Sequence, residues 1–148
     1  TNSQAEMESG GSGVIWEAAG WGFFDHMMQA FCVHGGFDMD LDMKGDLEVD
    51  CHHSIEDLGI VMGQAFQRLW VDKGSIRRYG SFYIPMDEAL GFCSLDISGR
   101  PYLVFDAEFA NQSVGTLDCC MVKEFSGHLH LMAESPCICG VLWGKRPP

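Results

Sequence analysis

The chain has 148 residues, with 21 Asp and Glu against 9 Lys and Arg, so its formal net charge at pH 7 is −12. That length is enough for one domain with a hydrophobic core, and the negative charge argues against non-specific binding to nucleic acid. No apolar stretch is long enough to cross a bilayer, and the chain does not open with the pattern of a signal peptide. We therefore expect a cytoplasmic protein with no membrane partner and no nucleic-acid partner.

The seven cysteines are odd in number and irregular in spacing. This pattern favours reduced thiols, many of them buried as small apolar residues. Cys137 and Cys139 form a CxC pair, but no second pair is present to complete a zinc site. The cysteines therefore give little support to a metal site of their own.

The first 44 residues carry three local patterns. Residues 1–13 are polar and Gly-rich, which indicates either a weak strand with a turn or a frayed start. Apolar residues at helical spacing predict a helix over 23–34, and Gly35 with Gly36 would end it. Strict alternation of apolar and polar residues over 37–44 predicts a half-buried strand.

The next part of the chain predicts a hairpin, a helix and more strands. Gly45-Asp46 is a turn sequence, and 47–49 would be the returning strand. Ser54 and Asp57 resemble a capping box at the start of a helix that runs to about Val71. The remaining predicted elements are strands near 81–84, 89–97 and 102–108, with a turn at 98–101. Helices that follow hairpins indicate an α+β protein with a mostly antiparallel sheet.

The segment DCHHSIED at 50–57 holds the most specific chemistry. His53 and Glu56 are three residues apart at a helix start, so they share a face of the helix. His52 would precede the cap and point elsewhere, so the two imidazoles could serve two ions. Imidazole nitrogen with carboxylate oxygen suits manganese, iron or zinc. The alternative is a pair of surface histidines beside a capping box.

For the other candidate residues, a purely structural role is an alternative to a role in the site. His26 lies next to Asp25, which could orient its imidazole as a metal ligand, or His26 could be a satisfied core residue. His34 could simply complement the helix dipole. Arg78 and Arg100 suit bidentate capture of a phosphate, or they are solvated surface charges.

Four long stretches resemble the imidazoleglycerol-phosphate dehydratase family in order and spacing: GFFDHMMQAF, GDLEVDCHHSIEDLGIVMGQAF, SIRRYGSFYIPMDEAL and LDISGRPYLVFDAEF. The resemblance covers about residues 10–125. It implies metal ligation by His26, His52, His53 and Glu56, with His26, His53 and Glu56 taking part in catalysis. It also implies a substrate site, whose residues would be His26, Met27, Gln29, His34, His52, His53, Glu56, Arg78 and Arg100.

The resemblance further implies a fold and a reaction. The fold would be two similar α+β half-domains of the ribosomal S5 domain 2-like type. The reaction would be a manganese-dependent hydro-lyase step of histidine biosynthesis, with two Mn²⁺ per active site. A small phosphorylated imidazole, D-erythro-imidazole-glycerol phosphate, would lose water to give imidazole-acetol phosphate. Subunits of the family form a homo-oligomer of 24 chains with sites at subunit interfaces.

The resemblance weakens after Phe125. We expect a first half-domain at 1–88, the start of an incomplete second half-domain at 89–125, and an aberrant, irregular tail at 126–148. The family's second HHxxE motif is not found there, and a shifted reading frame accounts for the tail as a hypothesis. Without a supporting helix, His128 and His130 could not replace the absent ligands. The alternatives are therefore an impaired remnant that binds a divalent metal or assembles without turnover, and a generic phosphate-binding protein that uses Arg78 and Arg100.

Overall fold

The computed structural model describes residues 2–16, 22–44, 51–71, 74 and 76–143. The predicted hairpin turn at 45–46 and its returning strand at 47–49 lie outside the described residues. The elements in chain order are β1 Asn2–Ser9, β2 Ile15–Trp16, α1 Gly22–Gly35, β3 Phe37–Lys44, α2 Cys51–Leu69, β4 Tyr79–Met86, β5 Ala89–Asp96, β6 Tyr102–Asp106, β7 Ser113–Val114, β8 Leu117–Asp118, α3 Cys120–Met132 and β9 Pro136–Trp143.

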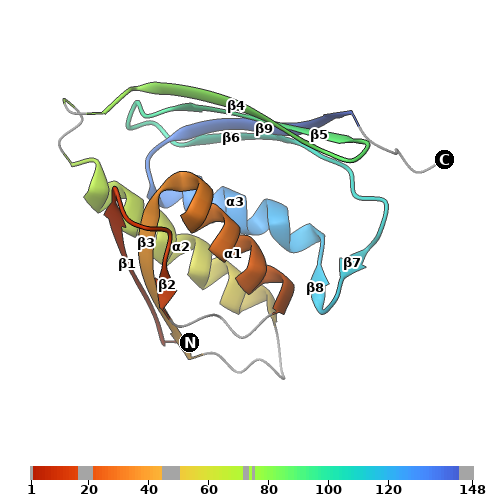
Figure 1. The fold of residues 1–148 in the computed structure, drawn as a ribbon, viewed down its shortest axis with the longest axis horizontal. Helices are drawn as coiled ribbons and strands as arrows, with labels where there is room; N and C mark the ends of the chain where they lie inside the picture. Colours follow the sequence, from red (N-terminus) through yellow and green to blue (C-terminus); the bar gives the residue numbers. More distant parts are fainter. Residues whose placement is uncertain (1, 17–21, 45–50, 72–73, 75, 144–148) are drawn as a thin grey trace.

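The protein is α+β, as the sequence predicts, with its helices packed against two separate sheets (Figure 1). The smaller sheet has the order β1-β3-β2, and β3 pairs antiparallel with β1. The alternation predicted for β3 is confirmed where side chains are described, because Met39 and Leu41 are fully buried while Asp40 is exposed. Gly36 follows α1 with φ of +66°, the left-handed conformation in which a glycine ends a helix at low cost.

The larger sheet has the order β4-β5-β9-β6. β4 and β5 form a hairpin, so the boundary predicted at residue 88 falls inside it, and the division into half-domains stays a prediction. The chain turns at 98–101, as expected, but β5 and β6 are not neighbours. β9 lies between them, antiparallel to β5 and parallel to β6. β9 begins 40 residues after β5 ends. Nothing in the sequence around β5 and β6 therefore indicates that a later strand will lie between them.

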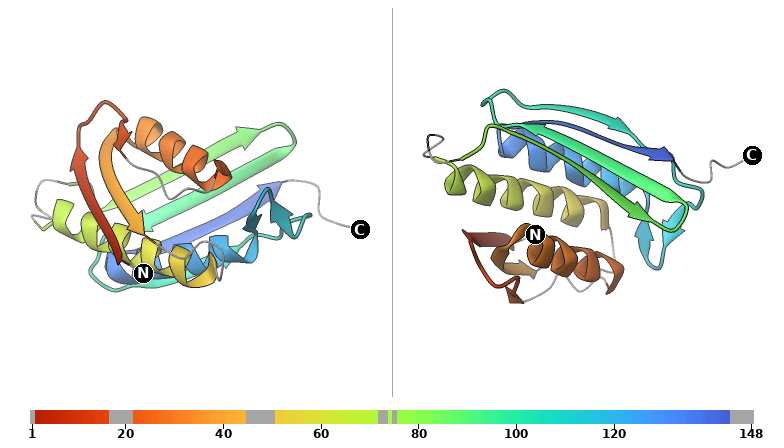
Figure 2. Two further views of the ribbon diagram at one scale, coloured as in Figure 1. Left: turned by 90° about the horizontal axis from the view of Figure 1, so that it is seen from below. Right: turned by 45° about the horizontal axis from the view of Figure 1, so that its top comes forward.

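α2 and α3 lie between the two sheets (Figure 2). Their close approach depends on Gly59 and Gly63, one turn apart on α2. A Cβ at Gly59 would be 2.8 Å from the carbonyl oxygen of Phe125, and one at Gly63 would be 2.5 Å from that of Leu129. The backbones of the two helices are therefore in direct contact, with no room for side chains between them at these positions.

The capping box predicted at Ser54 is wrong. α2 begins at Cys51, so Ser54 lies inside the helix and its side chain is 2% exposed. A residue in the fourth position of a helix cannot serve as its N-cap, because its own backbone is already helical. His52 therefore lies in the first turn of α2 together with His53, whereas the sequence predicted that His52 would precede the helix.

The irregular tail predicted after Phe125 is also wrong over the described residues. α3 continues to Met132, and β9 extends the large sheet to Trp143. Glu134, with φ of +51°, follows the helix, and two hydrogen bonds close its end: Ser135 N–H to His130 O and Glu134 N–H to Leu131 O. These bonds satisfy the last helical carbonyls in the manner of a Schellman motif.

One core joins α1, α2, α3 and the small sheet. Its buried apolar members are Ala5, Phe24, Met28, Cys32, Met39, Leu41, Ile55, Leu58, Met62, Ala65, Leu117 and Met121. Phe24 of α1 meets Phe125 of α3 edge to face, with ring centroids 5.4 Å apart. None of the helices built from described residues is both long and apolar enough to cross a membrane.

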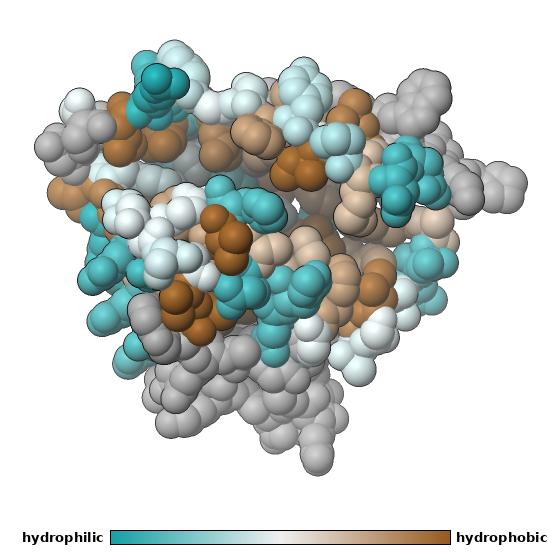
Figure 3. All heavy atoms as spheres, in the orientation of Figure 1, coloured by the Kyte–Doolittle hydropathy of each residue, from teal (hydrophilic) through white to brown (hydrophobic). Residues whose placement is uncertain are grey.

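The inner face of the large sheet is only partly covered. An apolar groove of about 280 Å³ lies between the sheet and α3, and Phe82, Ile84, Phe105, Phe109 and Val122 line it together with further residues of the sheet. Figure 3 shows apolar residues gathered on this face of the molecule, around a hollow in the surface. Phe82 and Ile84 remain 69% and 63% exposed.

Candidate active site

The HHxxE motif opens helix α2. His52 is half-buried, His53 is exposed, and their ring centroids are 6.0 Å apart. Glu56 lies one turn further along the same helix, four residues after His52 and three after His53. The start of α2 therefore carries two imidazoles and a carboxylate within its first turn and a half.

Glu56 also contacts His128, which the sequence analysis did not expect to take part in the site. The Nε2 atom of His128, on α3, lies 3.2 Å from Oε1 of Glu56. The contact exists because α3 packs along α2 through Gly59 and Gly63. The carboxylate of the HHxxE motif is therefore held by a second helix.

The candidate residues of α1 lie on its accessible side. His26, Met27 and His34 are exposed, and Met27 is 44% accessible despite its apolar side chain. Gln29 donates a hydrogen bond of 2.8 Å from Nε2 to the carbonyl oxygen of Gly13, which fixes the loop before β2. His34 falls in the last turn of α1, where a cation is favoured by the helix dipole.

Both candidate phosphate-binding arginines act on Asp96, the last residue of β5. Arg78 donates two hydrogen bonds to Asp96, of 2.7 Å from Nε and 3.2 Å from Nη2. These bonds hold the pKa of the Asp96 carboxyl below its ordinary value, and the charges of Arg78 and of exposed Arg100 act in the same direction. Nearby, Oγ of Ser98 is buried, and the Ser98 side chain also helps to lower the pKa of the Asp96 carboxyl.

The donor types fit a divalent transition metal, but the described residues of one chain do not complete a site. Within the part of the chain that the structure describes, no three His, Cys, Asp or Glu side chains converge on one point. Imidazole and carboxylate are suitable ligands for manganese, iron or zinc. His26 on α1 and the HHxxE motif on α2 therefore offer two separate sets of donors.

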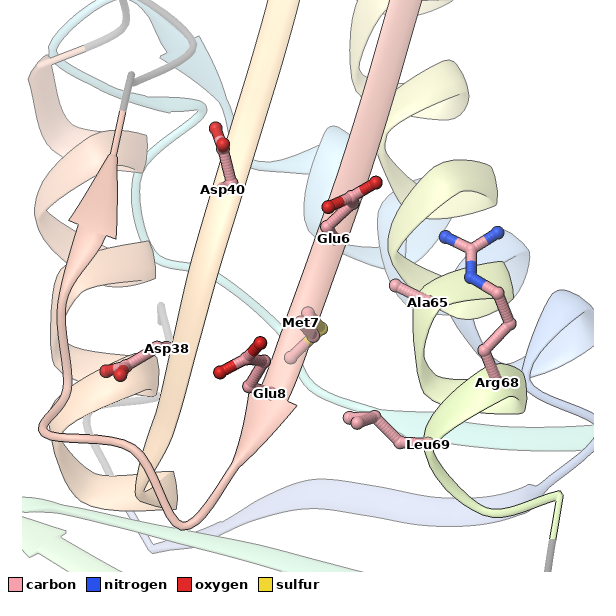
Figure 4. Close-up of a pocket in the computed structure, with 8 residues that line it drawn as sticks. All are labelled: Glu6, Met7, Glu8, Asp38, Asp40, Ala65, Arg68 and Leu69. Carbon is pink, nitrogen blue, oxygen red and sulfur yellow. The ribbon is translucent and has the colours of Figure 1, made fainter.

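A cavity of about 450 Å³ lies elsewhere, between the small sheet and the end of α2 (Figure 4). Acidic side chains dominate its sheet side, and the cross-strand register sets Glu6 opposite Asp40 and Glu8 opposite Asp38. Arg68 lies on its helix side and donates a hydrogen bond of 2.8 Å to the carbonyl oxygen of Ala5. None of the candidate site residues lines this cavity.

A model of the imidazoleglycerol-phosphate dehydratase family matches residues 19–146. The chain belongs to this family. The imidazoleglycerol-phosphate dehydratase of Acetivibrio thermocellus is 55% identical over 115 residues, which are 78% of this chain and 59% of that protein. The enzyme of Clostridium kluyveri is 43% identical over 146 residues, which are 99% of this chain and 75% of that one. The chain thus spans only part of the length of these relatives.

Solved imidazoleglycerol-phosphate dehydratases have the same fold. The structure from Staphylococcus aureus has a TM-score of 0.85 and 34% identity over 98% of this chain and 86% of that one. The structure from Pyrococcus furiosus, in complex with (S)-C348, has a TM-score of 0.76, 28% identity and covers 97% of this chain and 76% of that one. The family match continues through α3 and β9 to residue 146, and the shifted reading frame stays a hypothesis.

Sequence reasoning missed two residues of the site region. His128 was discounted because 126–148 taken alone lacks helical periodicity, whereas the apolar stripe begins earlier, at Met121 and Phe125, and continues to Leu129. Ser98 gives no sequence signal beyond its place in a turn. Its burial beside the Asp96 carboxyl becomes evident only from the structure.

Proposed function

We propose that this chain carries out the dehydratase reaction of its family. The substrate would be D-erythro-imidazole-glycerol phosphate, and the product imidazole-acetol phosphate. The observation that carries the proposal is the HHxxE motif in the first turns of α2, within a fold and a sequence match that extend over nearly the whole chain.

The imidazole end of the substrate would bind at His52, His53 and Glu56. The chemistry removes an unactivated C–H proton and releases the neighbouring hydroxyl as water, after which the enol tautomerises to the ketone. We infer that the half-buried and exposed imidazoles at the start of α2 have the access that such a substrate needs. His26 on the exposed side of α1 would contribute to a site of the same kind.

The phosphate end would bind where Arg78 and Arg100 flank Asp96. A phosphate would compete with Asp96 for the paired donors of Arg78, and guanidinium groups match phosphate geometry well.

We propose Mn²⁺ as the metal and a homo-oligomer as the active form, working in the cytoplasm. His26, His52, His53 and Glu56 would hold the ions, which when bound act as Lewis acids and as a template for the substrate. In the oligomer, ligands from α1 of one subunit and α2 of another would complete a site for which the described residues of a single chain bring no three donors together.

Replacing Glu56 tests the proposal. In Glu56→Gln, the neutral amide keeps the shape of the side chain but loses the charged ligand. We expect dehydratase kcat/KM to fall about a hundredfold or more, since even residues that only support metal ligands are worth about 10–100-fold. The measurement is formation of imidazole-acetol phosphate by purified protein loaded with Mn²⁺.

The matched control is Gln64→Ala, an exposed change on the same helix, which should leave kcat/KM unchanged. Wild-type protein that binds Mn²⁺ but forms no product would contradict the proposal and favour a protein that binds metal without turnover. Equal activity of wild type and Glu56→Gln would remove the assigned role of the motif.

A further inference from the structure

Strand β4 forms one edge of the large sheet, and no other strand of the described residues pairs with its outer side (Figure 2). All eight residues of Tyr79–Met86 are exposed. None of them carries a charge, although the chain has a net charge of −12. Free strand edges are usually protected by charged side chains, by short length or by a covering segment. A long, uncharged and apolar edge is therefore suited to pairing with a further strand.

The pairing of β4 with β5 determines which backbone groups of β4 face outward. Ile97 N–H donates a hydrogen bond of 2.9 Å to the carbonyl oxygen of Arg78, at the start of an unbroken antiparallel register. Residues that bond to the neighbouring strand alternate along an antiparallel ladder. The residues whose N–H and C=O positions face away from β5 are therefore Tyr79, Ser81, Tyr83 and Pro85. The missing N–H of Pro85 thus costs the sheet no hydrogen bond, as is usual for a proline on an edge strand.

We propose that β4 pairs with β4 of a second copy of this chain, antiparallel about a two-fold axis at Ser81. Ser81 then meets the partner's Ser81, Tyr79 meets the partner's Tyr83, and each pair exchanges both of its N–H···O bonds. A shift toward the hairpin would set Tyr79 opposite the partner's Pro85, which has no N–H to donate. The register about Ser81 uses every outward N–H of the strand.

The side chains fit the same register. On the inner face Phe82 falls opposite the partner's Gly80, and the space at Gly80 is open, since a Cβ there would meet nothing within 4 Å. An aromatic ring set across a glycine on a neighbouring strand shields the exposed backbone. On the outer face Tyr79 lies beside the partner's Tyr83, and cross-strand aromatic pairs stabilise a sheet. Pairing therefore removes large exposed rings from water on both faces.

The charges at the two ends of β4 favour a second copy as the partner. Arg77 precedes the strand and Asp87 follows it, and both are exposed. Antiparallel pairing about Ser81 sets Arg77 diagonally across from the partner's Asp87, at both ends of the contact. Two chains that each carry −12 repel one another, so an uncharged strand flanked by opposite charges is a favourable place for them to meet. This inference concerns assembly and does not rest on the proposed function.

Amide hydrogen exchange of the purified 148-residue chain, followed by NMR at increasing concentration, tests the pairing and its register. The N–H groups of Tyr79, Ser81 and Tyr83 should exchange about tenfold more slowly once about nine-tenths of the chains are paired, because only the unpaired tenth then exposes them. The N–H groups of Phe82 and Ile84 already bond to β5, so their exchange should not depend on concentration in this way.

Two variants with matched controls test the same contact by sedimentation. Ser81→Pro removes the N–H at the two-fold axis from both copies and should raise the dissociation constant about tenfold or more. Ser81→Thr keeps that N–H and the hydroxyl, and should associate like the wild type. Arg77→Glu leaves β4 unchanged, so it tests the pairing even if proline at 81 prevents folding. It sets acid beside acid and should weaken association about threefold or more at low salt, whereas Arg77→Lys should not.

Association of the wild type without slower exchange at Tyr79, Ser81 and Tyr83 would place the contact on another surface and overturn the inference. A chain that stays monomeric at every concentration would overturn it as well. Equal affinity of wild type, folded Ser81→Pro and Arg77→Glu would exclude β4 from the contact. Slower exchange confined to the three outward amides, and lost in Arg77→Glu, would support the pairing.

Discussion

Asp38 illustrates how one carboxylate organises a loop that the sequence shows only as Gly- and Ser-rich. Its Oδ1 accepts hydrogen bonds from the backbone N–H groups of Gly13, at 2.9 Å, and Val14, at 3.0 Å. Gly11 approaches so closely that a Cβ there would be 2.3 Å from Cγ of Asp38. The glycines of 10–13 therefore allow the chain to wrap around a negative charge.

These hydrogen bonds make stability depend on the charge of Asp38. The N–H donated by Val14, followed by that of Gly13, lowers the folded-state pKa of the Asp38 carboxyl below its ordinary value of 3.8. A depressed pKa means that the stabilisation is fully present above the unfolded-state pKa and is lost as the pH falls through the folded-state value. We expect Asp38→Asn to unfold at lower urea concentration than wild type at pH 7.

The difference in urea midpoint between the two proteins should be constant above the unfolded-state pKa of 3.8 and should shrink as the pH falls from there through the lower folded-state pKa. The carboxyls of Asp96 and Asp118 also have lowered pKa values, but both proteins retain them, so they cancel in the comparison. A difference that does not shrink below the unfolded-state pKa would show that Asp38 acts through shape and not through charge.

At the scale of the elements, the contact between α2 and α3 determines where Glu56 and His128 meet. It is made by backbone against backbone at Gly59 and Gly63, flanked by buried Leu58 and Met62. Glycine lowers helix propensity by about 1 kcal/mol relative to alanine. The two glycines therefore weaken α2 as an isolated helix, and the close packing they permit offsets that weakness.

Gly63→Ala should destabilise the fold even though it improves helix propensity. Its Cβ would lie 2.5 Å from Leu129 O and 2.6 Å from Cβ of Met132, and such overpacking costs about 1–3 kcal/mol. Gly127→Ala on α3 is the control, because its Cβ would meet only Leu103, at 3.9 Å. It should stabilise by about 0.5–1 kcal/mol. Thermal unfolding by circular dichroism measures both, and a stabilised Gly63→Ala would disprove the packing argument.

Elements with their own periodicity could be predicted from the sequence, and elements defined by distant partners could not. The alternation in β3 and the apolar spacing in α1 place both within a residue of where they lie. The start of α2 was misplaced because Ser54 and Asp57 mimic a cap inside a helix. β9 could not be predicted from the sequence, because its position in the sheet depends on β5 and β6, which lie far from it in the chain.

At the scale of the whole molecule, the family could be predicted from the sequence, the residues of the site stay a prediction, and the assembly of the site could not be predicted. Motif spacing identifies His52, His53 and Glu56 as a set, because they lie on adjacent turns of one helix. Whether His26 joins them depends on packing between separate helices, and the described part of one chain does not bring three donors together. Residue spacing can therefore identify ligands that lie on one helix, but it cannot show which ligands from different helices belong to one site.

The apolar groove under the large sheet governs the solution behaviour of this chain. Phe82 and Ile84 of β4 are mostly exposed beside Phe105 and Val122, although large side chains of this kind are normally removed from water. We expect the 148-residue chain to bind the dye anilinonaphthalene sulfonate (ANS) and to self-associate as its concentration rises, as measured by dye fluorescence and sedimentation.

The double variant Phe82→Ser/Ile84→Thr should reduce both signals, since it removes apolar surface from the groove while leaving two residues suited to a strand. Tyr102→Ser is the matched control, because Tyr102 is 70% exposed on β6 and does not line the groove. Because dye binding and association would arise from the same surface, they should fall together in the double variant. Persistence of self-association after dye binding is lost would place the contact between chains on another surface.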